Sequence, residues 1–323
     1  MQITFTISLV LAFIMGMAIQ RSNMCMVVGF DDFIHRRSAV RLLTILSTWM
    51  MVPGGLAILN LMTGYQLQVK VFPVTVWSVV GGLLLGIGAV VTGACTTGVL
   101  ARIGSGEYLF ILTIVGFATG CILAQSFGPV ATIHDVGIPT NVRPSYPLQA
   151  LLILLIVIAL NCRGLVHVRR SGWREFLNNA WDPRIGNIIV VIAMITLAQI
   201  YSRPWGYPEL LGAASRSSFD GIIGGLAIFA SLLTGTIVGG WTCTRAKIVG
   251  PLKGRFIRCF LGGLITGMGF SLCHGSLTGL TFFGQPLLLA YAWVVMAASY
   301  VSILIGLLYL RSSFGSRIKS LRK

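Results

Sequence analysis

Long apolar runs separated by short polar stretches extend from the N-terminus to about residue 310. A helix that crosses a bilayer needs about 20 apolar residues, and nine runs reach or approach that length. We therefore expect an all-α polytopic membrane protein with nine spans. The predicted spans lie near residues 3–20, 40–63, 74–93, 107–126, 147–162, 184–200, 219–241, 256–273 and 287–310.

One glycine-rich stretch occurs twice in this pattern. Residues 81–98 read GGLLLGIGAVVTGACTTG and residues 262–279 read GGLITGMGFSLCHGSLTG, so seven of eighteen positions are identical at a constant offset of 181. Each copy begins with small residues spaced for close helix packing in a bilayer and ends in irregular, Gly- and Thr-rich sequence. Irregular backbone at membrane depth is tolerated only where protein or a cavity surrounds it. Paired interruptions of this kind indicate the binding site of a transporter.

The distribution of charge predicts the orientation of the spans. Only 10% of the residues are charged, against about a quarter in a soluble domain. Twenty of the 24 Lys and Arg residues fall on one side of the predicted spans, and four fall on the other side: Lys70, Arg143, Arg203 and Arg216. The positive-inside rule therefore predicts an outside N-terminus and a cytoplasmic C-terminus. The net charge of +16 suits contact with the anionic lipid bilayer, and we expect no nucleic-acid partner.

This orientation makes the two copies an inverted-topology repeat, because spans one to four begin outside and spans six to nine begin inside. We expect a first repeat at residues 1–142, a connecting fifth span with a basic cytoplasmic loop at residues 143–183, and a second repeat at residues 184–323. No hydrophilic segment is long enough for a soluble catalytic domain, and the seven cysteines show no CxxC spacing. The sequence therefore predicts no enzyme activity, no catalytic residues, no metal site and no cofactor.

Thiol and hydroxyl side chains lie at the predicted helix breaks. Short segments at residues 24–30 and 202–208 each follow a span, so each repeat contributes two broken elements. Helix N-termini favour anions, and uncharged thiols and hydroxyls add donors that suit a soft sulfur anion better than phosphate, which favours arginine forks. The predicted substrate path comprises Cys25, Cys95, Ser276, Cys273, Thr96, Thr97 and Thr278, and the predicted supporting residues are Arg21, Arg203, His274, Gly98 and Gly279.

Four motifs in this order resemble the YeeE/YedE family of bacterial inner-membrane proteins. They are RSNMC at residues 21–25, GACTTG at 93–98, RPWG at 203–206, and GGLITGMG at 262–269 followed by GSLTG at 275–279. The resemblance implies nine spans, short central helices and thiosulfate import along a narrow path, where cysteine S–H groups pass the ion. Cys25 and Cys95 match two of the three family cysteines. At the third position the family usually has Gly-Gly-Cys, whereas this chain has His274-Gly275-Ser276.

That departure leaves three interpretations open: Ser276 donates in place of the thiol, Cys273 substitutes from the next turn, or the substrate differs. The expected function is a permease of the bacterial inner membrane for a small sulfur-containing anion, thiosulfate first. One alternative is transport of another sulfur or selenium compound. Another is a membrane sulfur-relay protein, in which Cys25 or Cys95 carries a persulfide for a cytoplasmic sulfur-carrier protein. None of the eight acidic residues stands out as a proton or sodium site within a span.

Overall fold

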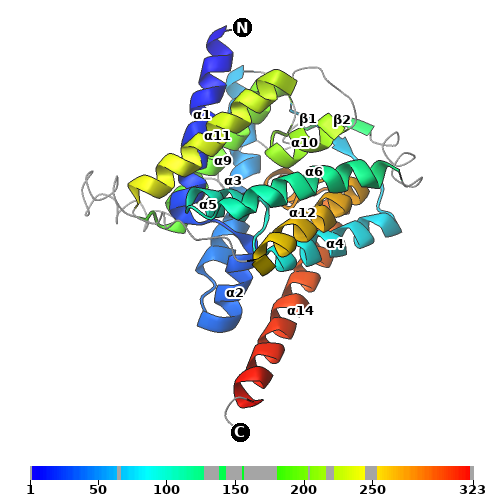
Figure 1. The fold of residues 1–323 in the computed structure, drawn as a ribbon. Helices are drawn as coiled ribbons and strands as arrows, with labels where there is room; N and C mark the ends of the chain where they lie inside the picture. Colours follow the sequence, from blue (N-terminus) through cyan, green and yellow to red (C-terminus); the bar gives the residue numbers. More distant parts are fainter. Residues whose placement is uncertain are drawn as a thin grey trace.

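The computed structural model describes residues 2–63, 67–126, 138–142, 155, 180–202, 204–215, 222–243 and 253–320, and most of its regular structure is helical (Figure 1). The first half contains α1 (Gln2–Ser22), α2 (Met26–Arg36), α3 (Val40–Thr63), β1 (Leu67–Val71), α4 (Val76–Thr92), α5 (Thr96–Gly104), η1 (Tyr108–Phe110), α6 (Ile111–Gln125) and β2 (Ile138–Val142). The second half contains α9 (Pro183–Tyr201), α10 (Tyr207–Ser215), α11 (Ile222–Thr242), α12 (Lys253–Cys273), α13 (Leu277–Gly279), η2 (Leu280–Gly284) and α14 (Ala290–Ser320).

Eight helical segments in the described part of the chain are long and apolar enough to cross a membrane. They coincide with eight of the nine predicted spans, which confirms an all-α polytopic membrane protein. The fifth predicted span, near residues 147–162, lies outside the described residues apart from Leu155.

Corresponding helices in the two halves are offset by about 181 residues. α1 begins at Gln2 and α9 at Pro183, whereas α4 ends at Thr92 and α12 at Cys273. α2, α3 and α5 likewise correspond in position to α10, α11 and α13. The order of helices therefore follows the offset seen in the sequence. The division at residues 142 and 183 stays a prediction, because most of the connecting segment lies outside the described residues.

Glycines bring the equivalent helices α4 and α12 into direct backbone contact. A Cβ on Gly88 would lie 2.7 Å from the Gly262 carbonyl oxygen, and a Cβ on Gly269 would lie 2.8 Å from the Gly81 carbonyl oxygen. Gly262 and Gly269 are the counterparts of Gly81 and Gly88. The first glycine of each helix therefore contacts the second glycine of the other helix, so the two helices run antiparallel. In Figure 1, α12 lies between α6 and α4, and both neighbours pack against it.

A small sheet, which the sequence analysis did not predict, pairs two segments far apart in the chain. β1 and β2 are antiparallel, with Leu67 opposite Val142 and Val71 opposite Ile138. The Leu67 and Val69 side chains are buried in the same apolar cluster as residues of α9. The next side chain along the strand, Lys70, is exposed, so the strand packs one face on the helices and presents a cation on the other.

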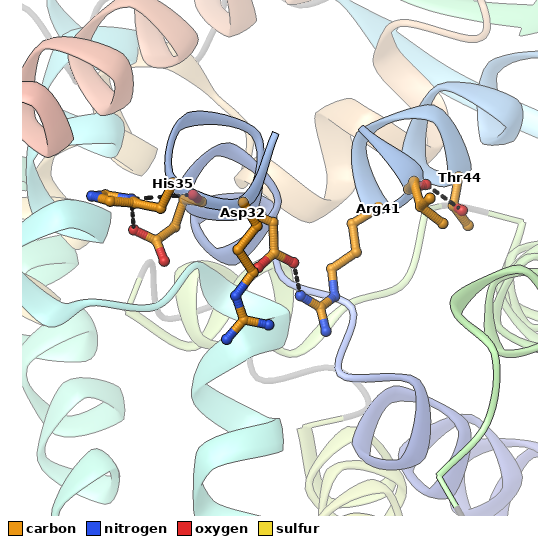
Figure 2. Close-up of polar contacts among 7 residues, drawn as sticks. Asp32, His35, Arg41 and Thr44 are labelled. Carbon is orange, nitrogen blue, oxygen red and sulfur yellow. Dashed lines mark hydrogen bonds and ion pairs between the residues drawn. The ribbon is translucent and has the colours of Figure 1, made fainter. Parts of the chain in front are cut away.

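Polar contacts connect the basic end of α2 to the start of α3. Figure 2 shows Asp32 of α2 paired with Arg41 of α3. On the neighbouring turn, His35 Nδ1 lies 2.9 Å from an Asp31 carboxylate oxygen. The Asp32–Arg41 pair holds α2 against α3. It therefore also helps to set the direction of the N-terminus of α2, at Cys25.

Candidate functional site

Four helix breaks in the described residues share one backbone feature. Each contains a residue with positive φ: Asn23 (50°), Gly93 (77°), Ser202 (60°) and His274 (57°). This left-handed conformation ends a helix, and a new short helix begins three to five residues later. The residues immediately before the four new helices are Cys25, Cys95, Gly206 and Ser276. Two thiols and one hydroxyl therefore lie at helix N-termini, where unpaired N–H groups favour negative charge.

The first half contributes a thiol pair, Cys25 and Cys95. Their sulfur atoms lie 3.2 Å apart, and both thiols are free. The Met26 N–H donates to Cys95 Sγ, and the Cys95 N–H donates to Cys25 Sγ, both at 3.3 Å. The two residues are buried, with exposed fractions of 2% and 4%. The N-termini of α2 and α5 therefore meet at two sulfur atoms.

Gly98 provides the space for this pair. A Cβ at position 98 would clash with Cys25 Sγ and would lie 3.1 Å from Cys25 Cβ. Because helical backbone accommodates alanine readily, the glycine here is explained by the close approach of the thiol. The sequence analysis named Gly98 as a supporting residue, and this contact gives it a physical role.

The second half contributes a carboxyl–hydroxyl pair, Glu209 and Ser276. Ser276, the counterpart of Cys95, donates its O–H to Glu209 Oε1 at 2.6 Å, and its N–H lies 3.4 Å from the same oxygen. A Cβ on Gly279, the counterpart of Gly98, would lie 2.5 Å from that oxygen. Glu209 belongs to α10, which is too short to cross a bilayer. Burial raises the pKa of its carboxyl above the ordinary value, although hydrogen bonds from Ser276 act in the opposite direction.

Hydroxyl groups connect the two pairs. Thr96 and Thr278 are hydrogen-bonded through their side chains, so α5 touches α13 across the two halves. Thr97 Oγ1 lies 3.2 Å from Cys95 Sγ. Tyr207 of α10 donates its O–H to the Thr96 carbonyl oxygen at 3.0 Å. Three short helices are thus held together by hydroxyl contacts beside the thiols.

Cavities of very different size lie on the two sides of α13. A cavity of about 280 Å³ is lined by Glu209, Gly279, His274 and Lys70, among others. A second cavity, of about 30 Å³, is lined by Cys95, Thr97, Thr278 and mostly apolar side chains. The larger cavity has room for a hydrated anion, whereas the smaller one has room for about two water molecules. The thiol pair, the carboxyl–hydroxyl pair and the threonines beside these two cavities are together called the constriction.

Two predicted residues lie near the constriction but outside both pairs. The Cys273 thiol lies 3.3 Å from the Gly275 carbonyl oxygen, within its own turn, so it does not take the place of Ser276 beside Glu209. His274 lines the larger cavity, where its ring stacks on Phe72 with centroids 4.4 Å apart.

Of the two predicted arginines, the structure describes Arg21 alone, and its contacts are with α11 and Trp181. Arg21 is buried at the contact of α1 with α11, where its Nη2 donates to Thr242 Oγ1 at 2.6 Å. Its guanidinium carbon also lies 5.2 Å from the centre of the Trp181 ring. Arg203 lies outside the described residues. Across the described ranges, no three His, Cys, Asp or Glu side chains gather as a metal ion would require.

The sequence analysis missed Glu209 and Tyr207. The search for acidic residues considered only the spans, whereas Glu209 reaches the constriction from a short helix between spans. The repeat carried the necessary signal, because Gly206 aligns with Cys25 and Glu209 follows it by three residues. One helical turn brings Glu209 back toward the place that the glycine leaves open.

These features define a multi-pass membrane protein whose broken helices meet at buried thiol and hydroxyl groups, and paired helix breaks of this kind are typical of membrane transporters. The chain belongs to the Sulphur transport family, the YeeE/YedE family, whose family model matches residues 21–305. It is also similar to the thiosulfate transporter TsuA of Escherichia coli strain K12. The two are 22% identical over a match of 298 aligned positions, and the match covers 82% of this chain and 83% of TsuA.

Proposed function

We propose that this protein is a permease of the bacterial inner membrane that takes up a small sulfur-containing anion, with thiosulfate as the first candidate. The contact between the Cys25 and Cys95 thiols, at the meeting point of two helix N-termini, carries this proposal. Membership of a sulfur transport family and the similarity to a thiosulfate transporter support it. In this proposal the protein catalyses no chemical reaction.

The donor groups of the constriction suit such an anion. Thiol and hydroxyl groups can donate to the ion at successive positions without a fixed charge that would hold it too tightly. The N-termini of α2 and α5 add favourable partial positive charge near the thiols. The polarizable sulfur of the thiols matches the terminal sulfur of thiosulfate. Because the 30 Å³ cavity beside Cys95 is too small for the ion, transport in this proposal requires that cavity to widen.

The direction of transport in this proposal follows from the positive-inside rule. Lys70 is one of the few basic residues predicted outside, and it lines the larger cavity. The anion would therefore enter through that cavity and leave past the thiol pair. The beginning of α1 and the end of α14 lie at opposite ends of the molecule (Figure 1), which supports termini on opposite sides of the membrane, as this orientation requires.

Burial of the thiols favours transport over a sulfur relay. A persulfide carrier needs an accessible, reactive thiolate, but Cys25 and Cys95 are 2% and 4% exposed. A cytoplasmic sulfur-carrier protein stays a predicted partner that could receive the ion after transport. The second candidate function is transport of another sulfur or selenium anion, because Ser276 occupies the place of the third family cysteine.

Uptake of labelled thiosulfate into proteoliposomes tests the proposal. Cys95→Ala removes a donor to a charged group, which contributes about 1.5–3 kcal/mol, so we expect uptake to fall by about tenfold to a hundredfold. Cys259→Ala is the matched control, since Cys259 is also buried but belongs to a separate apolar cluster. Equal uptake by the wild type and Cys95→Ala would refute the role of the thiol. A competition panel of sulfite, selenite and sulfate separates the two candidate substrates.

A further inference from the structure

The thiol pair and the carboxyl–hydroxyl pair occupy equivalent places in the two halves. Cys95 and Ser276 are 181 residues apart, and each contacts a side chain from the neighbouring short helix. Gly98 leaves space for Cys25 as Gly279 leaves space for Glu209. Glu209 therefore takes the position in the second half that a thiol takes in the first. It supplies a carboxyl to a constriction otherwise made of thiols and hydroxyls.

The surroundings of Glu209 are poorly suited to a negative charge. Its Oε1 accepts from Ser276, but its Oε2 is buried and has no hydrogen-bond partner among the described residues. A buried carboxylate oxygen without a donor carries a large desolvation penalty. A protonated carboxyl carries no charge and needs only an acceptor for its one O–H. The N-terminus of α10 offsets part of this penalty through its dipole, which does not supply a donor to Oε2.

The other titratable groups near Glu209 do not provide a close counter-charge. Tyr207 lies on the same helix, Tyr291 comes from α14, Cys273 and His274 come from the end of α12, and Lys70 comes from β1. Glu209 forms no salt bridge with a described residue within 4.0 Å, and Lys70 is exposed at the cavity. Lys70 can therefore attract an anion into the cavity without neutralising the carboxyl of Glu209.

We propose that Glu209 is a proton-binding residue of the substrate path, which passes the sulfur-containing anion only while this carboxyl is protonated. The inference rests on the proposed function. A protonated Glu209 offers an O–H to the anion beside Ser276, as the thiols do in the other half. An ionised Glu209 repels the anion at the constriction, where low polarity strengthens the repulsion.

The sign of the pH dependence follows directly. Uptake is highest below the pKa of Glu209 and is lost as the pH rises through that value, by up to about tenfold for each pH unit above it. Burial raises this pKa, so the loss occurs closer to neutral pH than for an exposed glutamate.

The test is uptake of labelled thiosulfate into proteoliposomes with equal pH on both sides, measured from about pH 5 to about pH 8. Glu209→Gln keeps the acceptor for Ser276 and supplies an N–H donor that does not titrate. We expect a flat profile for this variant, with more uptake than the wild type at the alkaline end. Asp31→Asn, the same substitution at a half-exposed carboxyl paired with His35, should keep the wild-type profile.

A profile of Glu209→Gln parallel to the wild type, or loss of uptake at every pH in folded protein, would overturn the inference. Infrared difference spectra between acidic and alkaline pH provide a second measurement that needs no substrate. They should contain a protonated-carboxyl band in the wild type that Glu209→Gln lacks, and identical spectra would overturn the inference as well. If the wild type takes up no thiosulfate at any pH, the proposed function fails, and the infrared comparison still decides the protonation of Glu209.

Discussion

Gly98→Ala tests whether the space beside Cys25 controls the thiol pair. The added Cβ would lie inside 3.0 Å of Cys25 Sγ, a separation that real Cβ atoms do not show. Overpacking of this kind costs about 1–3 kcal/mol, whereas replacing a helical glycine with alanine gains about 1 kcal/mol. We therefore expect a net destabilisation of up to about 2 kcal/mol, together with lower thiosulfate uptake because Cys25 is displaced from Cys95. Denaturant titration in detergent micelles measures the free energy of unfolding.

The Cys25→Ala background isolates the clash. Without the sulfur, the nearest remaining atom to the new methyl group is the Cβ of residue 25 at 3.1 Å, a tight but tolerable contact. Gly98→Ala should then be neutral or stabilising, which gives a coupling of about 1–3 kcal/mol between the two positions. Gly254→Ala is the control, since its Cβ would meet no atom within 4 Å. Equal destabilisation by Gly98→Ala in both backgrounds would refute the contact with the thiol as the cause.

Two further predictions separate path residues from structural ones. Tyr207→Phe removes the O–H that the Thr96 carbonyl oxygen accepts; it should lower stability by about 1 kcal/mol and reduce uptake, measured by unfolding and by proteoliposome assay. Arg21→Met removes the contacts with Thr242 and Trp181; it should lower stability by about 1–3 kcal/mol, while uptake per folded molecule, determined from the same assay, stays unchanged.

The apolar pattern predicted the spans well, because burial in a bilayer requires long uninterrupted apolar helices. The glycine repeat also located the breaks at Cys95 and Ser276, since irregular backbone needs small residues to pack. The paired strands β1 and β2 could not be predicted in this way. Their partners are about 70 residues apart in the chain, and pairing over such a distance depends on the packed helices beneath them.

The chemistry of the second half was harder to predict than its backbone. A search by residue identity found Ser276 and Cys273, but only three-dimensional contact shows that Ser276 donates to Glu209 while Cys273 bonds within its own turn. Arg21 also matched a motif, yet its contacts are with α11 and Trp181. A motif therefore located the right segment, and the direction of each side chain decided its role.

The two halves combine one backbone arrangement with two kinds of donor. Glycines at equivalent positions admit a thiol in one half and a carboxyl in the other, so the divergence changes the chemistry of the constriction without changing its packing. Two identical thiol pairs would respond alike to conditions on both sides of the membrane. With one thiol pair and one carboxyl–hydroxyl pair, the proposed permease has a carboxyl on the side of the larger cavity and none in the thiol pair. Passage of the anion would then depend on the protonation of Glu209 at the larger cavity, while the thiol pair beyond it selects for sulfur.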